Sequence, residues 1–304
     1  MPTSPLPFSA ALRHALPAAE WAGLRHSRET TTQRGVRNDR PDQNQSALEE
    51  GAMCEVLVDG HFGYAATADL SLAGLQRAFE RAIATTRATS AHQVHRFTPH
   101  QRPAASGRYR SPRHTSLDDT SLAEITDCLL AASRAMALSE LLVNRSARAM
   151  LVQTDIHYVS TSGADTQQSF ELVDITLSAT AAQGLESQTR SWSHTGQFGG
   201  EVFHRDTLTR QAQQVAQDAL ALLQADNCPS GRMDLVLMPD QMMLQIHESI
   251  GHPLELDRIL GDERNYAGWS FVKPHDFGTL QYGSELMNVS FDPTRAGEFA
   301  SYDF

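Results

Sequence analysis

The chain lacks several features that define common classes of protein. It carries 25 basic against 36 acidic residues, for a net charge of −11, so it has no excess of positive charge for general nucleic-acid binding. Lys273 is its only lysine, a bias that indicates genomic composition rather than mechanism. No stretch approaches the ~20 apolar residues of a membrane-spanning helix. We therefore expect neither a nucleic-acid partner nor a membrane segment.

Cysteine is scarce as well, and no secretory signal is evident. The three cysteines are Cys54, Cys128 and Cys228, an odd number spread far apart, which fits a reducing compartment better than a disulfide framework. The segment 1–21 has no long apolar core after a basic start. The sequence predicts a cytoplasmic protein. It also has no G-x-S-x-G elbow and no P-loop, which argues against other classes of hydrolase.

Three segments have the apolar period of a helix packed on a core. The chain of 304 residues is long enough for two domains, and its apolar fraction of 40% supports real hydrophobic cores. We expect helices after Ser71, after Asp118 and Asp119, and after Asp206. The apolar stripes are Leu72, Leu75, Phe79 and Ile83; Leu122, Ile125, Leu129 and Ala132; and Leu208, Ala212, Val215, Ala219 and Leu222.

Segments typical of strands lie between these helices. Residues 54–64, with Gly60 between their apolar parts, indicate a hairpin or a meander, and residues 151–180 indicate a second pair turning at Ser162 and Gly163. The alternation Ile156, Tyr158 and then Phe170, Leu172 predicts an antiparallel sheet with one solvated face. The expected fold is α+β, with an N-terminal antiparallel sheet and packed helices in a domain covering residues 1–227.

Residues 87–114 differ in composition from the rest. They hold six arginines, four histidines, three prolines and no acid. His92, His95 and His100 could form a metal cluster, and the arginines could bind an anion. We predict instead a solvated loop between helical units, because proline and polar clusters mark such loops.

A second break at residues 227–231 leads into a segment with different signals. Leu235 to Met238 is apolar and predicts a strand, and Pro239 with Asp240 as N-cap predicts the start of a helix. Met242, Met243, Ile246 and Ile250 would bury one side of that helix. A strand leading into a helix is a rigid mount for functional groups.

This helix carries the most informative motif of the chain, His247-Glu248-Ser249-Ile250-Gly251-His252. Neutral imidazole is a good zinc ligand, and a neighbouring glutamate can take a proton from a water molecule that the metal activates. The alternative is a solvated helix end with two unrelated histidines, because short motifs also occur by chance. The pattern favours hydrolysis of a peptide or related acyl bond.

The spacing of the two histidines requires a local change in the helix. Residues i and i+4 lie about 40° apart around an α-helix, whereas i and i+5 lie about 140° apart. The helix must therefore widen by one residue, as in a π-bulge, or end between the ligands. Gly251 could relax the backbone, and Pro253 could bias His252 out of the α region.

The chain from Cys228 through this motif to Gly283-Ser284-Glu285-Leu286-Met287-Asn288-Val289 resembles the TldD/PmbA family of metallopeptidases, also called modulators of DNA gyrase. The metal-bearing TldD branch carries H-E-x-x-x-H after a strand. Cys228-Pro229-Ser230-Gly231, Asp292-Pro293-Thr294 and Glu298, Ala300 and Ser301 fit as well, and a weaker similarity covers residues 60–65.

The resemblance implies a zinc-dependent peptidase with His247 and His252 as metal ligands and Glu248 as general base. It implies a second domain, residues 228–304, that is rich in β structure and carries the motif helix. It also implies unfolded or extended peptides as substrates, and a homodimer or a heterodimer with a related subunit.

The third protein ligand in the family is a cysteine in the C-terminal part, which we expect beyond Phe304, so that the second domain looks truncated. Cys228 is a poor substitute and His275 a fallback ligand. The nearby acids Glu255, Asp257, Asp262 and Glu263 could orient the histidines, or they could be surface charges; Glu255, three residues after His252, is the one to test. The rival hypothesis is a non-catalytic assembly subunit with an incomplete metal site.

Overall fold

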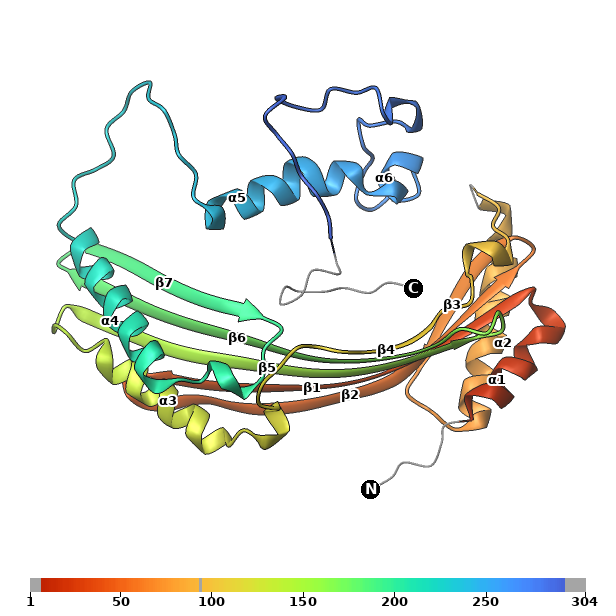
Figure 1. Ribbon diagram of the computed structural model, residues 1–304, viewed down its shortest axis with the longest axis horizontal. Helices are drawn as coiled ribbons and strands as arrows, with labels where there is room; N and C mark the ends of the chain where they lie inside the picture. Colours follow the sequence, from red (N-terminus) through yellow and green to blue (C-terminus); the bar gives the residue numbers. More distant parts are fainter. Residues whose placement is uncertain (1–6, 93–94, 293–304) are drawn as a thin grey trace. The chain divides into compact units, whose positions relative to one another are not determined.

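A computed structural model describes residues 7–92 and 95–292 of the chain (Figure 1). The family-like segment around Pro293 to Ser301 lies outside these residues. The described chain divides into two compact units, residues up to Ala225 and Asp226–Asp292, and each is considered by itself. Within the described ranges, no helix is long and apolar enough to cross a membrane.

The first unit is built on one mixed, mostly antiparallel sheet. Its seven described strands follow the order β3-β2-β1-β5-β6-β4, and β7 also pairs with β6. Only β4 and β6 run parallel. The strands are β1 (Trp21–Arg37), β2 (Arg40–Val58), β3 (His61–Thr67), β4 (Ser106–Arg110), β5 (Leu142–Ser160), β6 (Asp165–Gln183) and β7 (Glu186–Gly196). The α+β fold expected from the sequence is confirmed.

Tight turns set the register of the two long hairpins. Asn38 and Asp39 link β1 to β2, and Asp59 and Gly60 link β2 to β3, all four with positive φ. Paired positive φ values twist a two-residue turn in the same sense as the strands that it joins, and Asn, Asp and Gly tolerate them best. The hairpin predicted near Gly60 is confirmed.

Four helices cover the sheet in two groups: α1 (Phe8–Ala15) with α2 (Leu72–Thr89), and α3 (Leu122–Ala135) with α4 (Arg205–Leu222). Figure 1 shows the first pair at one end of the long strands and the second pair at the other. Leu24 contributes to the first core and Val36 to the second. These two residues of β1 are an even number apart, so both pairs cover the same face of the sheet.

Most residues of the predicted apolar stripes lie in these cores, but Leu72 and Leu122 are exposed, and one predicted helix cap also differs. Leu75, Phe79 and Ile83 are buried in the first core, and Ile125 and Leu129 in the second. Ser71 caps α2 as predicted, since its hydroxyl accepts a hydrogen bond from the amide of Gly74 at 3.1 Å. The cap of α3 is Ser121 rather than Asp118 or Asp119.

Two predictions in this unit need correction. Residues 87–114 are not only loop, because β4 lies within them and pairs with β6; a short edge strand gains its hydrogen bonds from a neighbour, which its own sequence does not reveal. In β6 the large buried apolar side chains are Val173, Ile175 and Leu177. Phe170 and Leu172, from which the alternation was inferred, have the opposite parity and are only half-buried.

The outer edge of β2 is free over much of its length. Residues 52–58 pair with β3, whereas residues 40–51 pair only with β1 within the described chain. The free part is polar, and Leu48 is its exposed large apolar side chain.

The second unit consists of short helical segments and turns. It contains α5 (Pro239–Ile246), a π-helical turn (His247–Gly251), a 3-10 turn (His252–Leu254) and α6 (Leu256–Leu260). An apolar pocket of about 260 Å³ is lined in part by Ile250, Leu254 and Phe277.

The strand predicted at Leu235–Met238 is wrong for the described structure. These residues adopt neither strand nor helix, and their side chains are exposed. A strand needs a neighbour to pair its backbone groups, and residues 226–292 contain no other strand. The cap assignment also shifts, since α5 begins at Pro239 after Met238 and Asp240 lies in its first turn. Proline suits this first position because its fixed φ matches the helix.

Candidate metal centre

Helix α5 widens at the sequence motif. The turn from His247 to Gly251 is π-helical, and the amide of His252 donates to the carbonyl of His247 five residues earlier. A π-turn holds one more residue than an α-turn, so side chains five apart return to the same side of the axis. The widening predicted from the histidine spacing is confirmed.

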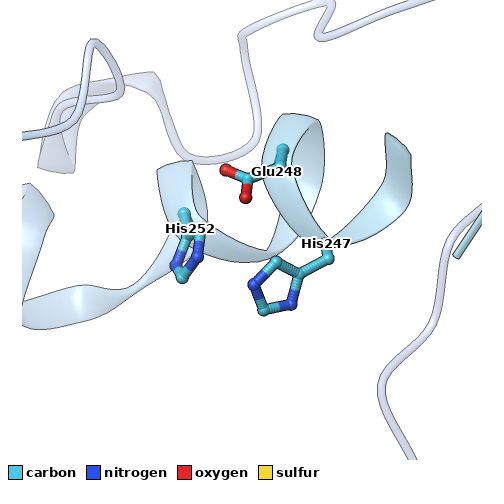
Figure 2. A group of neighbouring side chains, drawn as sticks. All are labelled: His247, Glu248 and His252. Carbon is cyan, nitrogen blue, oxygen red and sulfur yellow. The ribbon is translucent and has the colours of Figure 1, made fainter. Parts of the chain in front are cut away.

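The π-turn brings three potential ligands together. Nitrogen atoms of His247 and His252 and a carboxylate oxygen of Glu248 lie within 4.8 Å of one another. The two rings are 4.3 Å apart between centroids and nearly perpendicular, at 77°. Figure 2 shows both rings on one side of the helical segment, with the Glu248 carboxylate near the space between them.

This geometry fits a zinc ion. Two nitrogens that each bind one zinc at about 2.1 Å are at most about 4.2 Å apart. All three donor atoms lie within 4.8 Å of one another, a bound only slightly above that limit. Two imidazoles and a carboxylate are also a donor set that zinc accepts. His247 and Glu248 are exposed, and His252 is half-buried, which leaves room for a substrate.

The cause of the widening differs from the sequence hypothesis. Gly251 has φ −58° and ψ −66°, and His252 has φ −60° and ψ −43°, both in the right-handed helical region. A Cβ atom added at Gly251 would approach only the carbonyl of Ile246, at 3.9 Å. Neither glycine freedom nor a displaced His252 is therefore required.

Pro253 leaves one carbonyl of this segment without its usual helical donor. In an α-helix the carbonyl of Ser249 would accept from residue 253, but proline has no amide hydrogen. The hydroxyl of Tyr282 donates to this carbonyl at 2.5 Å. The carbonyl of Ser249 thus accepts a hydrogen bond from the side chain of Tyr282 in place of the backbone hydrogen bond that Pro253 cannot donate.

His252 is held by a carboxylate on its other nitrogen. Its Nδ1 lies 2.7 Å from Oε1 of Glu255. This hydrogen bond, with support from Arg258, holds the pKa of Glu255 below its ordinary value. Histidine ligands commonly donate their second N–H to a carboxylate in this way, which directs the free nitrogen at the metal. The prediction that Glu255 orients His252 agrees with this contact.

The other candidate ligands stay apart from the cluster. Cys228 is exposed, and His275 is exposed beside Asp276, with 3.7 Å between Nε2 and Oδ1. His92, His95 and His100 form no group of three possible ligands in the part of the chain that the structure describes. The expected cysteine ligand beyond Phe304 stays a prediction.

Sequence reasoning missed two residues that support this site. Arg258 contacts Glu255 and lies three positions after it, as Glu255 lies three after His252, so helical spacing could have indicated it. Tyr282 lies 33 positions from Ser249, and no local pattern links the two residues.

Two segments of the first unit match models of known protein families. Residues 22–86 match the model described as PmbA/TldA metallopeptidase domain 1. Residues 115–223 match the PmbA/TldA metallopeptidase central domain. Both matches fall in the first unit, whereas the motif lies in the second.

Curated relatives extend the similarity across the motif. The chain is 25% identical over 286 residues to a metalloprotease of Methanothermobacter thermautotrophicus, covering 94% of this chain and 59% of the relative. It is 33% identical over 110 residues to a metalloprotease of Methanocaldococcus jannaschii, covering 36% of this chain and 22% of the relative. The chain thus spans at most about three fifths of these relatives.

Solved structures share the fold. A protein of Bacteroides thetaiotaomicron described as a candidate modulator of DNA gyrase aligns with TM-score 0.56 at 15% identity, over 70% of this chain and 48% of that one. TldE of Thermococcus kodakarensis aligns with TM-score 0.52 at 11% identity, over 70% and 47%. Together with the two domain matches, which span most of the first unit, these findings show that the chain belongs to the TldD/PmbA family of metallopeptidases.

Proposed function

We propose that this chain forms part of a zinc-dependent peptidase in which His247 and His252 bind the metal and Glu248 is the general base. The observation that carries the proposal is the convergence of these three side chains, with all donor atoms within 4.8 Å. The names of the curated relatives, both metalloproteases, support the same reaction class.

Each residue has a defined task in this proposal. Zinc, when bound, supplies a Lewis acid that makes water more acidic and polarises a carbonyl group. Glu248 is exposed beside both imidazoles, so it can accept the proton of the attacking water and return it to the leaving amine. Glu255 fixes the ring of His252 through the 2.7 Å contact at Nδ1.

The substrate and the partner are proposed from the exposure of the site and from the family resemblance. An exposed site suits an extended or unfolded peptide, whose backbone groups can reach the donors from solvent. The family resemblance favours a homodimer or a heterodimer with a related subunit, and a third ligand from a cysteine C-terminal to Phe304.

Metal content tests the ligand assignment. The purified protein should hold one zinc per chain by plasma mass spectrometry after dialysis, and His247→Ala should lose it. His275→Ala is the matched control, because His275 is an exposed histidine of the same unit outside the cluster. A protein that assembles with a partner but holds no zinc would support the non-catalytic alternative.

The role of Glu248 requires a separate variant. Glu248→Gln keeps the size of the side chain but removes the base, so zinc content should persist while cleavage of an unstructured fluorogenic peptide falls by about 10²–10⁴-fold. Full peptidase activity of this variant with bound metal would exclude Glu248 as the general base.

A further inference from the structure

Glu255 bridges His252 and Arg258 with its two carboxylate oxygens. Oε1 contacts Nδ1 of His252 at 2.7 Å, and Oε2 accepts a hydrogen bond from Nε of Arg258. The three residues are spaced by three positions. The Glu255 side chain is 40% exposed, so on its own it would be free to turn into solvent. Arg258 is the contact that opposes this rotation.

The contact with Glu255 determines which nitrogen of His252 carries hydrogen. A carboxylate only accepts, so Nδ1 must carry the hydrogen, and Nε2 then keeps the lone pair that a metal needs. Nη2 of Arg258 also lies 3.2 Å from Nδ1. Arginine only donates, so without Glu255 it would favour the opposite tautomer, with hydrogen on Nε2. The position of the Glu255 carboxylate therefore determines whether Nε2 of His252 has a free lone pair for a metal ion or carries hydrogen.

Arg258 is itself fixed by the following loop. Its Nη1 donates to the carbonyl of Ala267 at 3.0 Å, and its own carbonyl accepts from the amide of Ser270 at 3.3 Å. Its side chain is only 19% exposed. A planar guanidinium can serve Glu255 and Ala267 at once, which the single ammonium of lysine cannot do in the same geometry.

We propose that Arg258 is a positioning residue of the metal site: it holds Glu255 against Nδ1 of His252 and so presents Nε2 of His252 to the metal. This inference rests on the proposed function for its consequence, zinc affinity. The contacts and the tautomer that it predicts do not depend on a metal.

A double-mutant cycle that measures zinc affinity tests whether Arg258 acts on His252 through Glu255. The dissociation constant of Zn²⁺, measured by competition with a chromophoric chelator, should rise about tenfold in Arg258→Gln and about 10–100-fold in Glu255→Ala. The double variant should bind zinc no more weakly than Glu255→Ala, because Arg258 acts through Glu255. Arg232→Gln, at an exposed arginine of the same unit, should match the parent protein. Independent effects that multiply, or an unchanged constant in Arg258→Gln, would overturn the proposal.

The tautomer of His252 is a metal-free readout. Long-range ¹H–¹⁵N spectra of histidine-labelled protein at pH 8, assigned with His252→Gln, should show hydrogen on Nδ1 in the parent. In Arg258→Gln the Nε2–H form should gain population. A parent that binds no zinc but shows the Nδ1–H form would contradict the proposed function and leave the role of Arg258 supported. An Nε2–H form in the parent would contradict the role of Arg258 itself.

Discussion

The three cysteines differ in how far the fold shields them from solvent. Cys54 is fully buried, and burial raises the pKa of its thiol to about 12. Cys128 is half-buried, and burial raises the pKa of its thiol as well. Cys228 is exposed. Because the thiolate is the reactive form, only about one Cys54 thiol in ten thousand would be ionised at pH 8.

These environments predict selective alkylation. Iodoacetamide at pH 8 should modify Cys228 at least 100-fold faster than Cys54, as measured by peptide mass spectrometry over time. Cys228→Ser should remove the fast phase, and denaturant should make Cys54 reactive. The unfolded thiol loses its proton near pH 9 and the folded one near 12, so Cys54 also makes the fold less stable as the pH rises through this window. Equal labelling rates in the native protein would contradict its burial.

At the scale of single residues, the sequence predicted the cluster of His247, Glu248 and His252 better than the residues that contact it. His247, Glu248 and His252 are adjacent in the chain, and a change of helix type is enough to gather them. Glu255 could be predicted because it lies one turn away. Tyr282 could not, since its contact with Ser249 depends on how the turns after residue 260 fold back.

At the scale of elements, we predict that the π-turn depends on the hydrogen-bond donor that Pro253 lacks. Pro253→Ala would supply an amide hydrogen for the carbonyl of Ser249 and so permit the α-helical register. His252 would then lie about 140° around the helix axis from His247. We expect zinc affinity to fall at least tenfold in this variant, measured by chelator competition.

Gly251→Ala is the control for that experiment. The added methyl group would meet no atom closer than 3.9 Å, and the backbone there is already helical. Its zinc affinity should stay within about twofold of the parent. If Pro253→Ala bound zinc as tightly as Gly251→Ala, the missing amide hydrogen would not be the cause of the π-turn.

The strands show where pattern-based prediction ends. Those that pack on helices, such as the buried part of β6, have an apolar alternation that predicts them. The middle of β1 is half-buried and polar, from Arg25 to Arg34, because it lies between the two groups of helices. Its strand state follows from pairing with β2 and β5, so no local pattern predicts it. The reverse error at Leu235–Met238 arose because apolar residues alone do not supply a pairing partner.

At the scale of the whole molecule, the segment that begins the second unit should be the most accessible to proteases. Residues 225–238 contain no helix or strand, and their side chains are exposed. Limited trypsin digestion should therefore cut first after Arg232, the only arginine or lysine in this segment, giving an N-terminal fragment of 232 residues by intact mass. Arg232→Gln should remove that first product. A first cut within β5 or β6 would contradict the compactness of the sheet.

The free edge of β2 bears on the behaviour of the protein at high concentration. Exposed edge strands can pair with strands of other molecules and so seed aggregates. Here the unpaired stretch begins with Arg40, Pro41 and Asp42 and ends with Glu49 and Glu50. Proline and charged side chains on an edge strand oppose such pairing. We therefore expect these residues, which have no part in the proposed metal site, to keep the sheet from pairing with the sheets of other molecules.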